Sequence, residues 1–343
     1  CNFFRSLGLD YLYVGEGNDI PSLVAAFAKV KDTSRPTVVH IHTQKGKGYA
    51  PAEADREEFH WEMPFDLETG KPKVDCSGME DYHSLTGKFL LEKMKEDHTV
   101  VAISSGTPTV IGFTPERRKQ AGRQFVDVGI AEEHAVALAS GIAAGGGRPV
   151  YGVYSTFIQR CYDQLSQDLC INGNPAVITV FMGTVAGMND VTHLGFFDIP
   201  LISNIPNMVY LAPTCSEEYF AMLEWAVRQT EYPVAIRVPG VAVVHRKEEF
   251  DTDYSELNRY KMTARGETVA ILALGSFYDL GQALKNKLRE ESGVEATLIN
   301  PRYITGLDEP MLEELKVGHR IVVTLEDGVL DGGFGEKIAR YYG

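Results

Sequence analysis

The 343-residue sequence is poor in cysteine and in positive charge, and it has no long apolar run. Its five cysteines form no CxxC pair, which disfavours a disulfide framework or a zinc ribbon and favours a reducing cytoplasm. The chain has 33 basic and 47 acidic residues, and the resulting net charge of −14 argues against nucleic acid as a partner. No apolar stretch reaches the length of a membrane span. A small anionic ligand stays possible, because it needs only a local cluster of donors.

The chain starts with CNFFR, which contains neither an initiator methionine nor the charged and apolar regions of a signal peptide. We therefore expect it to begin inside a larger protein. A hydrophobic content of 44% and a charged content of 23% are typical of a folded protein, and the length predicts two or three domains.

Apolar segments of strand length alternate with segments of helix length over most of the chain. We predict strands at 99–104, 149–154, 176–182 and 208–212, and helices at 82–96, 132–144, 157–171 and 216–230. A second alternating block has predicted strands at 269–274, 296–299 and 321–325. Such alternation predicts an α/β protein with doubly wound parallel sheets.

The composition divides the chain into five parts. Residues 1–49 contain one capped helix, with Asp19 as N-cap and Pro21 in the first turn, and one strand at 36–43, which is too little for a domain. Polar residues at 50–80 and a charged stretch at 246–267 read as linkers, and they leave two α/β blocks at 81–245 and 268–343.

Three stretches could carry chemistry. DVGIAEEH at 127–134 places Glu132 where a strand gives way to a helix rich in small residues. This carboxylate either complements the helix dipole or meets a flat cofactor that approaches closely, and the spacing leaves both possibilities open. The small residues of the same helix suit close packing, either within one domain or against a second chain.

The other two stretches follow predicted strands. YGVYSTFIQRCYDQ at 151–164 crowds Tyr154, Phe157 and Arg160 together, either as ordinary core packing or around a ligand. MNDVTHLG at 188–195 contains His193, which is either a proton carrier or a structural histidine. Open α/β sheets bind ligands at the carboxyl ends of their strands.

These three stretches, in this order, resemble the pyrimidine-binding domain of the 1-deoxy-D-xylulose-5-phosphate synthase family. The segments HIHTQKGKGYAPAEAD, IPNMVYLAPTCSEE, LINPRYITGLDE and TLEDGVLDGGFGE also resemble that family, so the resemblance covers essentially the whole chain. It implies a transketolase-like thiamine-diphosphate-binding fold. Residues 1–49 would end the diphosphate-binding domain, 81–245 would be the pyrimidine-binding domain, and 268–343 an incomplete C-terminal domain of transketolase type.

The resemblance implies a cytoplasmic homodimeric transferase that uses thiamine diphosphate and Mg²⁺. It would decarboxylate pyruvate, a 2-oxo acid, and join the product to the aldehyde glyceraldehyde 3-phosphate, in the synthesis of isoprenoid, thiamine and pyridoxal precursors. No nucleic acid or membrane is implied. The remaining alternatives are a divergent transketolase-like paralogue with a different acceptor, phosphorylated or not, and a non-catalytic partner subunit.

The resemblance also implies roles for individual residues. Glu132 would hydrogen-bond the aminopyrimidine ring and favour its imino tautomer, Phe157 would stack on that ring and Arg160 would lie beside it. His60 and His193 would move protons on the substrate side. The further cofactor contacts would be Tyr49 and Ile130, and the further substrate contacts Tyr154, Asn189, Asp190 and Arg237.

The sequence departs from the family's pattern in three places. The GDG…N segment, which anchors the diphosphate and Mg²⁺, would precede Cys1, so we expect no metal ligand in this chain and weak cofactor binding by it alone. Met182 stands where the family has an arginine for the acceptor's phosphate, and Asn189 where it has an aspartate. The RYPRG motif reads RVPGV at 237–241, which keeps Arg237 and loses the second arginine. We therefore hypothesise that the acceptor is not glyceraldehyde 3-phosphate, or is bound differently.

Overall fold

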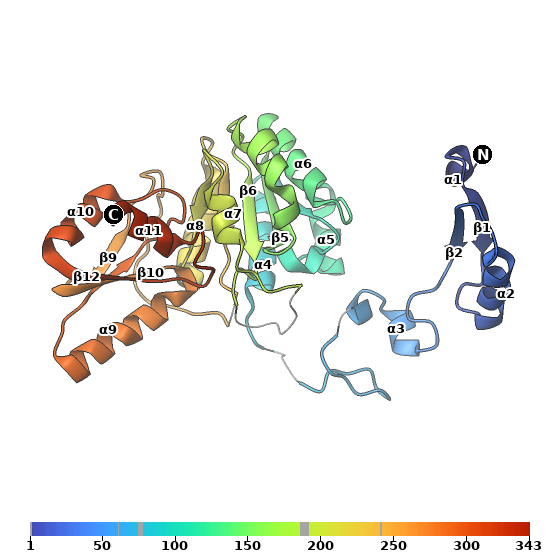
Figure 1. The fold of residues 1–343 in the computed structure, drawn as a ribbon, viewed down its shortest axis with the longest axis horizontal. Helices are drawn as coiled ribbons and strands as arrows, with labels where there is room; N and C mark the ends of the chain where they lie inside the picture. Colours follow the sequence, from blue (N-terminus) through green and yellow to red (C-terminus); the bar gives the residue numbers. More distant parts are fainter. Residues whose placement is uncertain (1, 61, 75–77, 186–191, 241) are drawn as a thin grey trace. The chain divides into compact units, whose positions relative to one another are not determined.

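The computed structural model describes residues 2–60, 62–74, 78–185, 192–240 and 242–343 (Figure 1). The chain forms two compact units, which we call unit 1 (Cys1–Met79) and unit 2 (Glu80–Gly343). Asn189 and Asp190 lie outside the described residues. Within the described part, every helix is too short or too polar to cross a bilayer.

Unit 1 is built on two parallel strands, β1 (Asp10–Val14) and β2 (Thr37–Ile41), connected through α2 (Ile20–Val30). The side chain of Asp19 accepts a hydrogen bond of 2.9 Å from the Ser22 amide, so the predicted helix start is confirmed. The predicted linker contains short helices. The remaining helices of unit 1 are α1 (Phe3–Ser6), α3 (Ala50–Ala54) and the 3₁₀ turn η1 (Glu58–His60).

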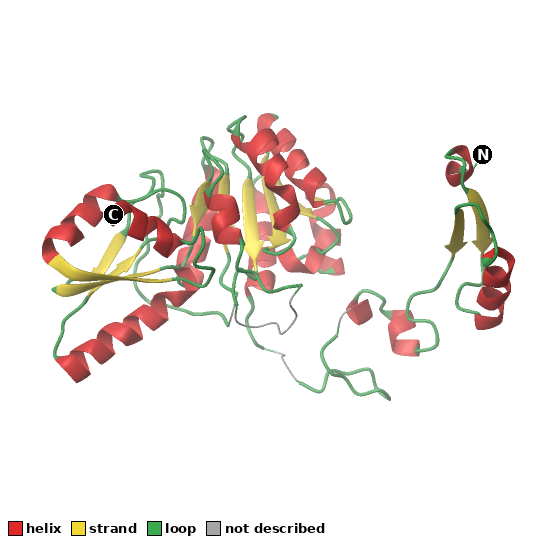
Figure 2. Cartoon of the chain, in the orientation of Figure 1, coloured by secondary structure: helices red, strands yellow, loops and turns green. Residues whose placement is uncertain are grey.

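The larger sheet of unit 2 has six strands, all parallel (Figure 2). In spatial order they are β4 (Phe125–Asp127), β3 (Val100–Ser104), β5 (Arg148–Tyr154), β6 (Val177–Phe181), β8 (Val234–Arg237) and β7 (Val209–Leu211).

Helices cover both faces of this sheet. Ile103 and Tyr151 point into a core that contains α6 (Glu132–Ala144), whereas Ala102 and Val150, one residue earlier on the same strands, point into a core with α4 and α8. Successive strand residues face opposite sides, so both faces are buried. The predicted doubly wound parallel sheet is confirmed. The other helices here are α4 (Tyr82–Glu96), α5 (Pro115–Ala121), α7 (Asp198–Ser203), α8 (Ser216–Arg228) and the 3₁₀ turns η2 (Pro108–Ile111) and η3 (Gly122–Gln124).

The segment predicted as one α-helix at 157–171 has a different structure. It forms a 3₁₀ turn, η4 (Ile158–Cys161), and then a π-helix, η5 (Gln164–Cys170). Its buried apolar residues pack in the same core as α6, but the hydrogen-bond register is not that of an α-helix. Irregular helices of this kind often lie at functional sites.

The second sheet of unit 2 has the order β12–β10–β11–β9, in which β9 alone is antiparallel to its neighbour. The elements of this part are β9 (Lys261–Ala264), β10 (Thr268–Ala273), η6 (Gly275–Phe277), α9 (Tyr278–Ser292), β11 (Thr297–Asn300), α10 (Glu309–Gly318), β12 (His319–Leu325) and α11 (Phe334–Tyr342). Tyr210 of the large sheet and Phe334 of α11 share one hydrophobic core, which joins the two sheets in a single unit.

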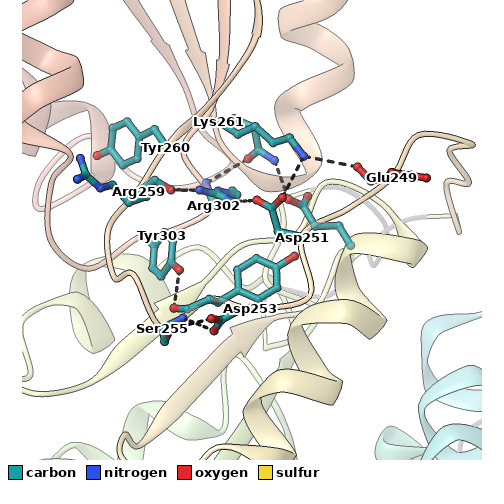
Figure 3. A network of polar contacts seen from close by, with 12 residues as sticks. Glu249, Asp251, Asp253, Ser255, Arg259, Tyr260, Lys261, Arg302 and Tyr303 are labelled. Atoms are coloured by element: carbon teal, nitrogen blue, oxygen red, sulfur yellow. Dashed lines mark hydrogen bonds and ion pairs between the residues drawn. The ribbon is translucent and has the colours of Figure 1, made fainter.

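The charged stretch between the two sheets is fixed by polar contacts (Figure 3). Arg302 donates through Nε to the Arg259 carbonyl at 3.0 Å and pairs with Asp251. The Tyr303 hydroxyl donates to the Tyr254 carbonyl at 2.8 Å, and the Tyr254 ring is buried. The stretch thus runs along the loop after β11 as an ordered segment.

Candidate active site

Chemically useful side chains gather at the carboxyl edge of the six-stranded sheet. Tyr154 ends β5 and Phe181 ends β6, while Glu132 starts α6 shortly after β4. Parallel strands direct their carboxyl ends to one edge, and open α/β sheets bind ligands there. The site therefore lies where the fold itself predicts it.

Glu132 is buried and forms an ion pair with Arg160. It is 2% exposed, and its Oε2 accepts a hydrogen bond of 3.1 Å from Nη1 of Arg160, whose side chain is 51% exposed. Among the described residues no donor reaches Oε1. The carboxylate also lies in the first turn of α6, where the helix dipole favours negative charge. Arg160 can therefore hold Oε2 of this carboxylate while Oε1 binds a ligand.

Three aromatic rings pack together on the same edge of the sheet. The centroids of Tyr154 and Phe157 are 5.3 Å apart, and His193 lies 5.4 Å from Tyr154 and 5.3 Å from Phe157. All three pairs are edge-to-face, a favourable arrangement for aromatic rings. Burial raises the pKa of Tyr154, so its hydroxyl is a neutral donor near pH 7. The cluster brings together three of the predicted residues.

His83 belongs to the same edge, and the sequence analysis missed it. Its ring stacks on Phe181 at 4.7 Å and lies 6.4 Å from Tyr154. Its Nδ1 donates to the Val110 carbonyl at 2.6 Å, and burial lowers its pKa, so the ring is neutral and Nε2 is an acceptor. Its position in the first turn of α4 was the available signal, because helices that precede parallel strands begin at the carboxyl edge.

Arg237, which the sequence predicts as a substrate contact, is buried and paired with Asp198. It is 5% exposed, its Nε donates to Asp198 Oδ2 at 2.7 Å, and its Nη2 donates to the Asp327 carbonyl at 2.6 Å. Asp198 also accepts from the buried Tyr210 hydroxyl. In this geometry the guanidinium donates to the chain's own acceptors and links β8 to α7 and to the loop after β12.

Three further predicted residues lie in loops or short turns. Ile130 is 82% exposed, just before α6. Tyr49 and His60 belong to unit 1, where the Tyr49 ring contacts Phe59 at 5.6 Å and His60 contacts Lys45.

The cysteines in the part of the chain that the structure describes are poor nucleophiles. All three are buried, and burial raises the pKa of Cys161 and Cys170 to about 12 and that of Cys215 to about 11. No group of three or more His, Cys, Asp or Glu side chains there is placed to hold a metal ion.

Comparison with known families agrees with this fold. The family model described as the transketolase pyrimidine binding domain matches residues 80–243, and the one described as the transketolase C-terminal domain matches residues 259–343. The chain belongs to the transketolase family. The first match contains Glu132, Phe157 and His193, and the second begins in the ordered stretch before β9.

Within the transketolase family, the chain is similar over nearly its whole length to proteins named 1-deoxy-D-xylulose-5-phosphate synthase. It is 36% identical over 336 residues to that of Lachnoclostridium phytofermentans, covering 98% of this chain and 53% of the relative. It is 36% identical over 340 residues to synthase 1 of Geobacter sulfurreducens, covering 98% and 52%. The resemblance stated from the sequence is confirmed, and the chain spans about half the length of these relatives.

Solved transketolase structures share the fold. A structure titled "Split gene transketolase, inactive beta4 tetramer" matches with a TM-score of 0.62 at 24% identity, over 74% of this chain and 82% of that one. The Pichia stipitis transketolase in complex with sedoheptulose 7-phosphate matches with a TM-score of 0.60 at 13% identity, over 98% and 67%.

Thiamine diphosphate is the cofactor that this family implies, and the residues present fit it. A buried carboxylate with one oxygen open to a donor suits a ring nitrogen, and the neighbouring Phe157 supplies an aromatic ring for stacking. Arg160 holds the other oxygen of Glu132 and thereby fixes the orientation of the carboxylate.

Proposed function

We propose that this chain supplies the pyrimidine-facing part of a thiamine-diphosphate site in a transferase. The reaction is decarboxylation of a 2-oxo acid, pyruvate, followed by joining of the remaining carbon unit to an aldehyde. The observation that carries the proposal is the buried Glu132 at the start of α6, held by Arg160 on one oxygen only. Its relatives' name, 1-deoxy-D-xylulose-5-phosphate synthase, supports the reaction class.

The protein's own residues bind, orient and move protons. When bound, thiamine diphosphate supplies a nucleophilic carbon that accepts the acyl group. Glu132 would hydrogen-bond a nitrogen of the cofactor's pyrimidine ring and hold a proton there. Phe157 would stack on the same ring. His193 and Tyr154 face the substrate side, where His193 transfers a proton and the neutral Tyr154 hydroxyl donates a hydrogen bond.

The roles implied for the remaining residues complete the proposal. Tyr49 and Ile130 contact the cofactor, His60 moves protons, and Asn189 or Asp190 contacts the substrate. Arg237 is left out of the substrate site, because its donors are engaged with Asp198 and Asp327. Mg²⁺ and the diphosphate are held by residues other than those that the structure describes. The protein acts as a homodimer in the cytoplasm, and its product feeds isoprenoid and thiamine synthesis.

The experiment measures the full-length protein with thiamine diphosphate, Mg²⁺ and pyruvate. We expect CO₂ release that rises when a short aldehyde is added and that depends on the cofactor. A transketolase-like paralogue would instead transfer a ketol unit from a ketose phosphate to an aldehyde without releasing CO₂. Absence of both reactions, with the cofactor bound, would favour a non-catalytic subunit.

A further inference from the structure

A small cavity lies next to the candidate active site, and no role has been assigned to it. Its volume is about 240 Å³, below the range of about 300–1,000 Å³ that is typical of sites for drug-sized ligands. It lies between the start of α4 and the segments that follow β6 and β8. The lining residues are Glu80, Asp81, Tyr82, His83, Phe181, Met182, Pro239, Gly240 and Ala242.

The cavity adjoins the residues that face the substrate. His83 lines it and contacts the Tyr154 ring, which in turn contacts His193. Met182 also lines the cavity and directly follows the last residue of β6. Its carbonyl oxygen closely approaches Gly195, which lies two residues after His193. A molecule that reacts beside Tyr154 and His193 can therefore extend its far end into the cavity.

The lining contains no positive side chain. Of the nine residues, the charged ones are Glu80 and Asp81, and the rest are apolar, aromatic or, in His83, a neutral imidazole. The nearby Arg237 is committed to Asp198 and does not line the cavity. A phosphate group placed here would meet the carboxylates of Asp81 and of Glu80, which is paired with His245, and no lysine or arginine of the lining. Phosphate sites in proteins rely on charge-assisted hydrogen bonds from arginine or lysine, so this lining excludes a phosphate.

One polar atom of the lining can recognise a neutral group. The Nδ1–H of His83 is used on the Val110 carbonyl, so Nε2 carries the free lone pair of the ring. Among the described residues Nε2 has no partner. A hydroxyl group can donate to this nitrogen, whereas an ionised phosphate oxygen has no proton to donate and is repelled by the lone pair.

We propose that this cavity holds the end of the acceptor aldehyde that is remote from its carbonyl group, and that this end is an uncharged, hydroxyl-bearing carbon chain. The inference rests on the proposed function, which it deepens by naming the acceptor as a short unphosphorylated hydroxyaldehyde. Glyceraldehyde without its phosphate is the simplest molecule of this class.

Direct binding to the full-length protein tests the cavity independently of turnover. Saturation-transfer NMR would compare D-glyceraldehyde with glyceraldehyde 3-phosphate. We expect wild type to bind the neutral aldehyde about tenfold or more tightly, and Met182→Arg to strengthen binding of the phosphate ester about ten- to a hundredfold. Met182 already has a left-handed backbone, with φ of 56°, so exchanging one unbranched side chain for another adds no new backbone strain.

A matched control separates local from general charge effects. Val317→Arg adds the same charge at a position that is 90% exposed, at the end of α10, and it should change neither affinity. Equal or tighter binding of the phosphate ester by wild type would overturn the proposal. So would an equal response of both ligands to Met182→Arg.

A second variant tests the hydroxyl contact. His83→Asn keeps a donor near the Val110 carbonyl and removes Nε2. We expect about two- to tenfold weaker binding of D-glyceraldehyde and unchanged binding of propanal, which lacks the hydroxyl groups. Equal loss for both aldehydes would contradict the hydroxyl contact. CO₂ release from pyruvate is measured in the same preparations. If the protein binds the aldehydes with the expected preference but shows no turnover with any of them, the proposed function is refuted and the ligand preference of the cavity stands.

Discussion

Nη1 of Arg160 lies 3.1 Å from Oε2 of Glu132, and it ties a half-exposed cation to a carboxylate that is almost completely buried. Burying a carboxylate without a partner is costly, and the contact with Arg160 offsets part of that cost. The contact uses one oxygen and leaves the other for a ligand. It therefore also orients Glu132.

Replacing this carboxylate tests the proposed chemistry. Glu132→Gln keeps the shape of the side chain but removes its ability to hold a proton for the cofactor's ring. General acid–base groups contribute about 10²–10⁴-fold to enzymatic rates, and we expect a loss of that size in CO₂ release by the full-length protein.

The neighbouring glutamate provides the control. Glu133→Gln removes a carboxylate from the same helical turn and should leave the rate within about twofold of wild type. Unchanged turnover in Glu132→Gln would show that Glu132 is not the activating carboxylate. A thermal unfolding curve for each variant would separate loss of folding from loss of chemistry.

The fold was predictable where local pattern and burial agree. The helices at 82–96 and 132–144 were placed with the bounds that the structure has, because caps and apolar spacing mark them. The strands β1, β4, β8 and β9 were missed, because each is only three to five residues long and gives a weak sequence pattern. The irregular segment at 158–170 was predicted as an α-helix, because apolar spacing does not distinguish a π-helix from an α-helix over two turns.

The site was predictable only in part. Glu132, Phe157, Arg160, Tyr154 and His193 were singled out from the sequence, and the structure brings all five to one edge of the sheet. His83 comes from a helix that precedes the first strand of the sheet, so no local spacing links it to Tyr154. The hydrogen bonds of Arg237 could not be predicted, because its partners, Asp198 and Asp327, are 39 and 90 residues away in sequence.

The Arg237–Asp198 pair should be decisive for stability. Arg237 is 5% exposed and Asp198 is fully buried, so removing one partner leaves an uncompensated charge in the interior. We expect Arg237→Met to destabilise unit 2 by about 3–5 kcal/mol in urea unfolding. The double variant Arg237→Met with Asp198→Leu should recover part of this loss, since neither charge remains.

An exposed pair serves as comparison for that experiment. Arg259 and Glu256 are 44% and 77% exposed, and Glu256→Gln should change the unfolding free energy by about 0–1 kcal/mol. If Arg237→Met were as mild as this control, Arg237 would be available for the substrate contact predicted from the sequence.

The outer face of α6 is the place to test the proposed homodimer. Gly141 is exposed within this helix, and no atom lies within 4 Å of a Cβ built on it. If a second chain packs closely there, Gly141→Arg should shift the full-length protein from dimer to monomer in analytical ultracentrifugation. Gly318→Arg, at an equally open position in α10, should leave the dimer intact. A dimer that persists in Gly141→Arg would place the interface elsewhere.

His245 should make stability depend on pH in a defined direction. Its Nδ1 lies 2.7 Å from Glu217 and its Nε2 2.7 Å from Glu80, and these carboxylates raise its pKa. Because the folded-state pKa exceeds the ordinary value of about 6.5, the stabilisation is fully present below that pH and is lost as the pH rises through the folded-state pKa. We expect His245→Gln to lower the melting temperature at pH 5.5 and to approach wild type at pH 9. A difference that grew with pH would contradict this assignment, because the ring would then be stabilising in its neutral form.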